Sequence, residues 1–378
     1  MTIDESVLED AQRIEAGDPG DMLRAVASSA AQVRESAAAA HEAGIARLAD
    51  EGRPRSVVVL GMGGSGISGD VFAALAGPES PVPVFVHKGY GLPRWIGAAD
   101  LVVAVSCSGG TEETLSALEA AVRRGCRTLV IGAANSPVAE LANAGRALFV
   151  PVDARGRQPR SMMWGLSTPL AIAADALGLA EIPQGEIEAT AMRLEEIATV
   201  CRPDSDSFVN PGKTLALALA DRLAMTWGTT DIANVAAYRM LCQLAENAKL
   251  PGIAGNLPEA NHNQVVAFDG PAGGGSAEDI FNDPDEGGST GQKLRLVLLR
   301  DHADEHPQVT RRADVSEVIA QDRGVAVTAL KAEGVSRFER LASLVAPIDY
   351  ATVYLALLLG LDPTPVVAIQ DLKARIAV

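Results

Sequence analysis

Runs of apolar and β-branched residues alternate along the first half of the chain with segments whose apolar positions recur every three or four residues. The short runs predict buried strands, and the longer periodic segments predict helices. A long alanine-rich helix is expected first, over residues 21–50. The predicted strands that follow cover residues 56–60, 82–87, 101–105, 128–131 and 147–152. The predicted helices between and after them cover residues 68–76, 112–124, 137–144 and 168–178.

The same alternation starts again in the second half, beyond a polar segment that runs from Pro183 to Pro211. Strands that alternate with helices form parallel sheets with helices on both faces. The pattern therefore predicts an α/β protein of two doubly wound domains, residues 1–180 and 212–378, joined by a connection over 181–211. In the second domain, helices are expected at 213–220, at 233–249 and before the last strand, and strands at 222–227, 265–268, 294–299 and 325–329.

The composition agrees with this fold class. The chain has 378 residues, of which 48% are hydrophobic and only 4% aromatic, so alanine, valine and leucine supply most of the core. The formal net charge of -16 argues against a nucleic-acid partner, which would need a basic surface. The segment at 269–292 is dense in Gly, Asp and Pro, and it predicts a mobile surface loop, either a solvated insertion or a lid.

The four cysteines stand singly, which indicates neither a disulfide framework nor a zinc site, and no metal is expected. The N-terminal sequence is acidic and polar, unlike a signal peptide. The longest apolar stretch, Tyr350 to Leu361, is too short to span a membrane and suits a buried helix. We therefore expect a cytoplasmic protein without a membrane partner.

Candidate chemistry is concentrated in the loop after the third predicted strand, where Ser106, Ser108 and Thr111 accompany Gly109 and Gly110. A strand that turns into a helix N-terminus presents unpaired N–H groups and the positive end of the helix dipole, which favour an anion. An ordinary helix cap needs only one hydroxyl. The surplus of hydroxyls predicts a phosphate-binding loop, and hence a phosphorylated small molecule as ligand.

A glycine-rich loop follows the first predicted strand. Gly61, Gly63 and Gly66 satisfy the pattern G-x-G-x-x-G of dinucleotide-binding folds. Such a site also needs an acidic residue at the end of the next strand, where this chain has His87 and Lys88. A nicotinamide-dependent oxidoreductase is therefore the weaker alternative, and no cofactor is expected. We expect the loop to approach a sugar or its phosphate instead.

A third candidate region contains Glu246 near the end of a predicted helix and His262 in the turn that follows. A carboxylate and an imidazole supply the base and the proton donor needed to move a proton between adjacent carbons of a sugar. Taken alone, a histidine flanked by Asn261 and Asn263 is more often an ordinary hydrogen-bonded loop residue. The pair is therefore a hypothesis that other residues must support.

As a set, these segments match a known family. The chain resembles the bifunctional phosphoglucose/phosphomannose isomerases, which are built from two sugar isomerase (SIS) domains. The resemblance spans nearly the whole chain and rests on the ordered motifs GMGGSGISGD, SCSGGTEET, PRSMM, ENAKLPG, LPEANHN and YLALLLGLDPTPVVAIQDLK. It implies two SIS-type domains and an aldose-ketose isomerase. The implied reaction interconverts glucose 6-phosphate or mannose 6-phosphate with fructose 6-phosphate through a cis-enediolate.

The resemblance also implies roles for individual residues. Those that match the loops binding the phosphate and meeting the sugar are Ser106, Ser108, Thr111, Gly64 and Ser65. Arg160 matches the arginine that stabilises the enediolate, and Glu246 matches the carboxylate that transfers the proton. His262 matches a ring-opening histidine that comes from the partner subunit in the family, so a homodimer with shared active sites is implied. Lys373 matches a lysine that reaches the sugar ring, and Thr364 is a candidate for the position that allows both epimers.

The sequence departs from the family pattern at four positions near these motifs. An aromatic residue, an amide, a cation and a glutamate of the family are replaced here by Cys107, Gly110, Leu241 and Gln264. None of the four is a residue to which the resemblance assigns chemistry. The alternative function is a sugar-phosphate-binding regulator with weak or no turnover, and an assay for fructose 6-phosphate formation distinguishes it from an isomerase.

Overall fold

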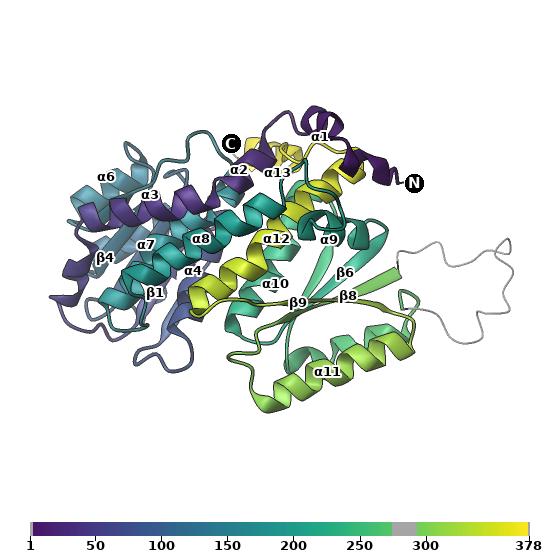
Figure 1. Ribbon diagram of the computed structural model, residues 1–378. Coiled ribbons are helices and arrows are strands. Elements are labelled where there is room, and N and C mark those ends of the chain that lie inside the picture. The colour runs from purple at the N-terminus through teal and green to yellow at the C-terminus, as the bar shows by residue number, and fades with distance from the viewer. Residues whose placement is uncertain (1–2, 274–292, 377–378) are drawn as a thin grey trace, which may run out of the picture. The chain divides into compact units, whose positions relative to one another are not determined.

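The computed structural model describes residues 3–273 and 293–376 (Figure 1). Within them, every strand belongs to one of two parallel sheets, and helical segments connect consecutive strands except between His87 and Leu101. The predicted α/β class with two doubly wound sheets is therefore confirmed. The predicted mobile loop at 269–292 lies outside the described residues from position 274 onward.

The first sheet has the strand order β2-β1-β3-β4-β5. Its strands are β1 (Val57–Leu60), β2 (Val84–His87), β3 (Leu101–Ser106), β4 (Arg127–Gly132) and β5 (Leu148–Pro151). All neighbours are parallel, and Val59 of β1 lies opposite Val86 of β2 and Val103 of β3. Parallel strands end at one edge of a sheet, so the glycine loop after β1 and the hydroxyl loop after β3 emerge side by side.

Helices cover both faces of this sheet, which explains why β1 and β3 are buried along their whole length. On one face, Leu118 of α5 and Ala142 of α6 join a core with Val58, Val102 and Val130. The other face is covered by α3, α4 and α7. The helices concerned are α3 (Ser29–Glu42), α4 (Gly63–Ala76), α5 (Glu112–Arg123), α6 (Pro137–Ala144) and α7 (Met163–Ala176).

The second sheet has four parallel strands in the order β7-β6-β8-β9. They are β6 (Arg222–Gly228), β7 (Gly252–Asn256), β8 (Lys293–Arg300) and β9 (Ala326–Lys331). Thr226 and Trp227, which are adjacent in β6, mark its two faces. The Thr226 hydroxyl contacts the Met240 sulfur of α10 (Asp231–Gln243). Trp227 joins the core beneath α11 (Pro307–Asp322) on the opposite face.

The remaining helical segments connect or extend these layers. They are η1 (Glu5–Glu9), α1 (Ala11–Gly17), α2 (Met22–Ala27), η2 (Ile45–Ala49), η3 (Pro159–Ser161), α8 (Gln184–Val200), α9 (Pro211–Leu219), η4 (Leu244–Ala248), η5 (Glu259–His262), η6 (Gln264–Asp269), α12 (Arg337–Leu358) and α13 (Val367–Ile376). Among the described residues, α12 alone is long and apolar enough to cross a membrane, but 89% of its most apolar window is buried in the protein. The helix expected near Tyr350 is thus a buried core helix.

The chain forms two compact units that are not consecutive halves. The first unit comprises Ala27–Glu195 and Gly334–Ala342, and the second comprises Met1–Val26, Glu196–Glu333 and Ser343–Val378. The boundaries expected near 180 and 212 differ from these units because the N-terminal segment packs in the second unit. There the buried ammonium of Lys213 donates to the carbonyl of Leu8, and also to the carbonyls of Pro203 and Ser205 at 2.8 and 2.7 Å.

The local structure differs from expectation in three places. The connection expected at 181–211, within which the chain passes from one unit to the other after Glu195, includes α8, a regular helix with its own buried positions. The supposed strand at 265–268 is the 3-10 helix η6, in which Phe268 is buried while Val266 is 65% exposed. The actual edge strand, β7, was not expected, because two of its five residues are glycine. In both of the last cases tertiary packing overrides local strand preference.

A buried ion pair follows the carboxyl end of β8. The Arg300 guanidinium donates to both carboxylate oxygens of Glu305, each at 2.9 Å, and the two side chains are only 5% and 1% exposed. Burial favours the neutral carboxyl group. Hydrogen bonds from Arg300 and Thr310 outweigh that effect and lower the pKa of Glu305 to about 2.

Because the pKa of Glu305 is lower in the folded than in the unfolded chain, this group stabilises the fold above about pH 4.5 and loses that effect as the pH falls toward 2. We expect Glu305→Gln to lower the free energy of unfolding by about 3 kcal/mol at pH 7 and by much less at pH 3. Urea unfolding followed by circular dichroism at both pH values measures this. Glu317→Gln on α11 is the control, and equal losses at both pH values would contradict the assignment.

Candidate functional site

The hydroxyl loop between β3 and α5 places its side chains in two different roles. Ser106 is buried, and its Oγ accepts the backbone N–H of Gly109 at 3.1 Å, which closes the loop. Gly109 has a φ of +70°, a left-handed conformation that suits glycine. Ser108 is exposed, and its Oγ lies 3.4 Å from Oγ1 of Thr111. Ser106 therefore shapes the loop, while Ser108 and Thr111 face outward.

Thr111 occupies the N-cap position of α5, but its side chain makes no capping hydrogen bond to the helix. An ordinary cap would satisfy one of the free N–H groups at the helix start. Here the Thr111 hydroxyl instead accepts from the Ser106 hydroxyl and lies 3.4 Å from that of Ser108, so the N-cap side chain leaves the first N–H groups of the helix without a cap. A phosphate would complete such an arrangement, since helix N-termini bind anions.

The glycine loop after β1 touches both the hydroxyl loop and the segment that carries Arg160. The Ser65 hydroxyl accepts the backbone N–H of Cys107 at 3.0 Å. A Cβ atom placed on Gly64 would lie only 2.8 Å from the carbonyl group of Pro159 and 2.9 Å from the backbone nitrogen of Arg160. Gly64 thus allows two backbone segments to approach each other closely. From the sequence, the glycine loop had been expected to approach the sugar.

Arg160 itself is nearly buried, at 2% exposure, in the 3-10 helix η3. Gln32 of α3 holds the turn that follows: its Nε2 donates to the carbonyl of Ser161 at 2.8 Å, and its Oε1 accepts from the N–H of Gly165 at 3.2 Å. The first unit therefore groups the candidates Gly64, Ser65, Ser106, Ser108, Thr111 and Arg160 at the carboxyl edge of its sheet.

Cys107 of the hydroxyl loop and Thr114 of α5 are both buried. Cys107 is buried, and this burial raises the pKa of its thiol to about 11, so the thiol stays protonated at neutral pH and is not a nucleophile. Thr114 is 2% exposed and belongs to the buried face of α5. Cys107, which stands where the family pattern has an aromatic residue, thus belongs to the core beneath the loop.

Glu246 lies on η4, a π-helical turn that continues α10. Such a turn inserts one residue into an α-helix and is frequent at functional sites. Its neighbour Asn247 is buried and donates to Oγ1 of Thr352 at 3.0 Å. With Asn247 turned inward, Glu246 is left half-buried at the surface. No sequence pattern indicated this turn.

Lys249 ends the π-helical turn in a left-handed conformation, with a φ of +59°. Its ammonium group donates to the carbonyl of Glu246 at 2.6 Å and to the carbonyl of Pro363 at 3.3 Å. Lys249 thereby joins the turn that carries the candidate base to the segment that contains Thr364. The sequence placed Lys249 in the motif ENAKLPG but indicated no role for it.

The departure at Leu241 is accommodated by packing. Leu241 lies against Gly252 of β7. The remaining cation of this region, Arg239, forms a buried ion pair with Asp349 of α12, with an Nη2–Oδ2 distance of 2.8 Å and both side chains at most 4% exposed. Arg239 therefore connects two helices of the second unit.

His262 ends η5 and is exposed, on the loop that follows the carboxyl end of β7. Glu246 precedes the amino end of the same strand, because α10 runs back from β6 to the start of β7. A five-residue strand separates the two ends by about 15 Å. Glu246 and His262 of one chain are therefore at opposite edges of the sheet. Lys373 is exposed on α13, which buries none of its residues.

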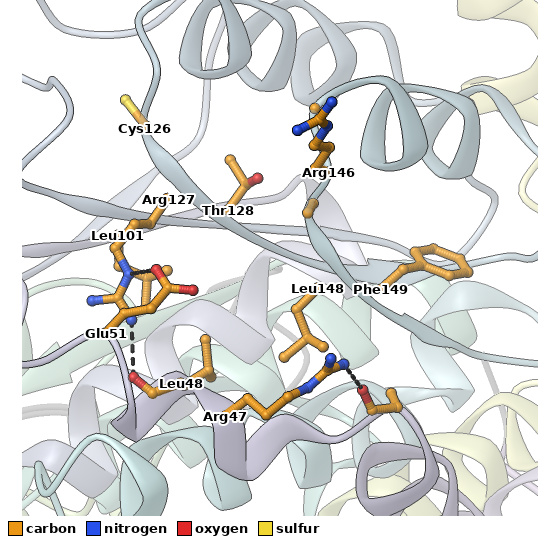
Figure 2. Close-up of a pocket in the computed structure, with 13 residues that line it drawn as sticks. Arg47, Leu48, Glu51, Leu101, Cys126, Arg127, Thr128, Arg146, Leu148 and Phe149 are labelled. Atoms are coloured by element: carbon orange, nitrogen blue, oxygen red, sulfur yellow. Dashed lines mark hydrogen bonds and ion pairs between the residues drawn. The ribbon is translucent and has the colours of Figure 1, made fainter.

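A cavity of about 400 Å³ in the first unit lies apart from all these residues (Figure 2). It opens where β3, β4 and β5 begin, at the edge opposite the hydroxyl loop. Arg127 in its wall donates to the carbonyls of Gly52 and Leu48 at 2.8 and 2.9 Å and forms an ion pair with Glu51 at 2.6 Å. These contacts fix the chain around η2, so the Arg127 guanidinium serves the fold.

Two family models match the chain. The SIS domain matches residues 53–159, and the bacterial phospho-glucose isomerase C-terminal SIS domain matches residues 208–376. Two solved structures show the same fold at low sequence identity. A hypothetical protein from Thermus thermophilus aligns with a TM-score of 0.68 and 17% identity over 98% of this chain and 95% of that one. The C-terminal domain of glucosamine-fructose-6-phosphate aminotransferase from Francisella tularensis aligns with a TM-score of 0.64 and 12% identity, over 91% and 98% of the two chains.

Curated relatives share more of the sequence. The bifunctional phosphoglucose/phosphomannose isomerase of Caldicellulosiruptor bescii is 30% identical over 85% of this chain and 89% of its own length. The enzyme of the same name from Aquifex aeolicus is 32% identical over 85% of this chain and 90% of its own length. With two matching SIS domains and such relatives along most of its length, the chain belongs to the bifunctional phosphoglucose/phosphomannose isomerase family.

Proposed function

We propose that this isomerase interconverts glucose 6-phosphate and mannose 6-phosphate with fructose 6-phosphate through a cis-enediolate. The observation that carries the proposal is the hydroxyl loop, where Ser108 and Thr111 precede α5, the N-cap side chain makes no capping hydrogen bond, and the glycine loop connects to the segment of Arg160. The family relatives are named for this activity. A purely regulatory sugar-phosphate-binding role is disfavoured, because every residue to which the family assigns chemistry is present.

The phosphate group of the substrate binds far from the reacting carbons and supplies orientation. Hydrogen bonds from Ser108, Thr111 and the N–H groups of α5 hold it, and Ser106 keeps the loop closed through Gly109. Binding energy from this remote group fixes the first two carbons near the base. The phosphate loop thus lowers the barrier without touching the reacting atoms.

Arg160 acts on the charge that develops during the reaction. Removal of a proton from the second carbon places negative charge on the enediolate oxygens. A guanidinium is permanently cationic and is worth more in that state than in the neutral substrate. Because Arg160 is nearly buried and its backbone is packed against Gly64, it is positioned before substrate binds.

Glu246 is proposed as the base that takes the proton from the second carbon and returns it to the first. One carboxylate can serve both transfers, since the two carbons are adjacent. The π-helical turn supports this role because it turns Asn247 inward and leaves Glu246 at the surface. Proton transfer of this kind needs a base and charge stabilisation, so we propose neither a metal nor a cofactor.

His262 is proposed to open the sugar ring in the active site of a partner subunit. Its separation from Glu246 by the length of β7 supports a site assembled from two chains. We therefore propose a homodimer with shared active sites, acting in the cytoplasm without nucleic-acid or membrane partners. Lys373 would reach the sugar ring, and Thr364, next to the turn held by Lys249, would contact the part of the sugar that differs between epimers.

Replacing Glu246 with Gln keeps the shape of the side chain and removes the base. We expect turnover to fall by about 100- to 10,000-fold, while the inhibition constant of inorganic phosphate stays unchanged. A coupled assay for fructose 6-phosphate measures the first quantity, and competition measures the second. The half-buried Glu317 of α11 provides a control, Glu317→Gln, which should retain full turnover. Near-normal turnover of Glu246→Gln would exclude it as the base.

Ser108→Ala and Thr111→Val should weaken substrate binding, each by about 1.5 to 3 kcal/mol for a lost hydrogen bond to the charged phosphate. KM for glucose 6-phosphate and the inhibition constant of inorganic phosphate should rise together. Ser116→Ala, which alters a hydroxyl one turn further along α5, is the control and should change neither. If inorganic phosphate inhibits all the variants equally, the loop does not bind phosphate.

The shared site predicts complementation between two inactive proteins. His262→Ala and Glu246→Gln should each have little turnover, but mixing them under conditions that exchange subunits should restore part of the activity. A mixed dimer assembles one site with both wild-type groups. No recovery despite demonstrated exchange, or full activity of a wild-type monomer, would refute the shared site. The assignment of Glu246 would be unaffected.

A further inference from the structure

The turn that presents His262 is held by the residues on either side of it. Asn261 donates to the Ser316 hydroxyl of α11 at 2.7 Å, and Asn263 donates to the carboxylate of Glu259 at 2.9 Å. His262, between them, is exposed, and no hydrogen bond of its ring occurs among the described residues. These two hydrogen bonds restrict the backbone on both sides of His262. The arrangement directs one imidazole outward from a fixed backbone.

Gln264 connects this turn to the sheet. Its Oε1 accepts the indole N–H of Trp227 at 2.6 Å, and its Nε2 donates to the carbonyl of Ala254 at 3.0 Å. Trp227 belongs to β6 and Ala254 to β7, so one side chain bridges two neighbouring strands. Both functions of the amide are satisfied, and the residue begins η6 two positions after His262.

The hydrogen-bond partner of Gln264, Trp227, is itself packed in the core. Trp227 is fully buried, and its ring stacks on Phe268 with a centroid distance of 5.6 Å. A Cβ atom on Gly255 would approach Oε1 of Gln264 to 2.5 Å, so the glycine leaves room for the amide. A buried indole N–H that loses its acceptor costs free energy, which favours the observed position of Gln264 over others.

We propose that Gln264 is a positioning residue for ring opening, acting through His262 and not on the substrate. The inference rests on the proposed function of His262. Proton transfer requires the imidazole within hydrogen-bond distance of the ring oxygen, and small displacements of such a group slow the reaction strongly. A glutamate at this position, as in the family pattern, would accept from Trp227 but could not donate to the carbonyl of Ala254. Glutamine therefore fixes the turn through one more bond.

The test compares Gln264→Met, His262→Ala and the double variant in the intact protein. Methionine keeps the volume of the side chain and removes both hydrogen bonds. We expect kcat for glucose 6-phosphate to fall about tenfold in Gln264→Met and more in His262→Ala. Adding Gln264→Met to His262→Ala should change kcat by less than twofold, because the group that it positions is already absent. Gln321→Met, at an exposed amide of α11, is the control.

A second measurement separates positioning from general damage. The compound 5-phosphoarabinonate is an acyclic sugar-acid phosphate that resembles the enediolate and needs no ring opening, so the constant for its competitive inhibition should change less than twofold in Gln264→Met. A multiplicative loss of kcat in the double variant, or an inhibition constant that rises in parallel with the loss of kcat, would overturn the inference. If Gln264→Met does not fold, Trp227→Phe removes the same hydrogen bond from the other side and is judged by the same criteria.

Failure of the inference and failure of the proposed function give different results. A wild-type protein that binds 5-phosphoarabinonate but forms no fructose 6-phosphate would refute the proposed isomerase activity, and with it the role of Gln264. An active wild type whose Gln264→Met variant keeps full kcat would refute the positioning role alone.

Discussion

The part of the candidate site that lies in the first unit depends on a contact between two backbone segments. The backbone of Gly64 lies against the backbone of Pro159 and Arg160, closer than any Cβ atom would allow. Side chains can move to relieve a clash, but two packed backbones cannot do so without moving their elements. The start of α4, the hydroxyl loop bonded to Ser65 and the arginine segment therefore share one fixed arrangement.

Much of the first unit could be predicted from the sequence, because short stretches of the chain determine its strands and loops. Buried parallel strands produce continuous β-branched runs, so β1, β3 and β4 were visible in the sequence. Binding loops follow the carboxyl ends of such strands, which is why Ser108 and Thr111 could be named before their geometry was known. The sequence did not show that Ser106 closes the loop while Ser108 is exposed, because this difference depends on the direction in which the strand end turns each side chain.

The second unit was harder to predict because distant packing decides its local structure. β7 has a weak strand sequence and forms because it pairs with β6, while the apolar residues at 265–268 become a 3-10 helix beneath α11. The N-terminal segment joins this unit through Lys213, a residue that no pattern marks as buried. The opposite placement of Glu246 and His262 also follows from topology, whereas the sequence had suggested the two residues as a pair.

The π-helical turn at Leu244–Ala248 makes the length of this segment as important as its residues. An ordinary α-helix advances by about 100° per residue, so the loss of a single residue here would restore regular helical bonding and turn Glu246 by that angle. The carboxylate would then leave the half-buried position that it now has beside the inward-facing Asn247. Sequences descended from this one should vary freely in composition on the outer face of α10, yet rarely gain or lose a residue before Lys249.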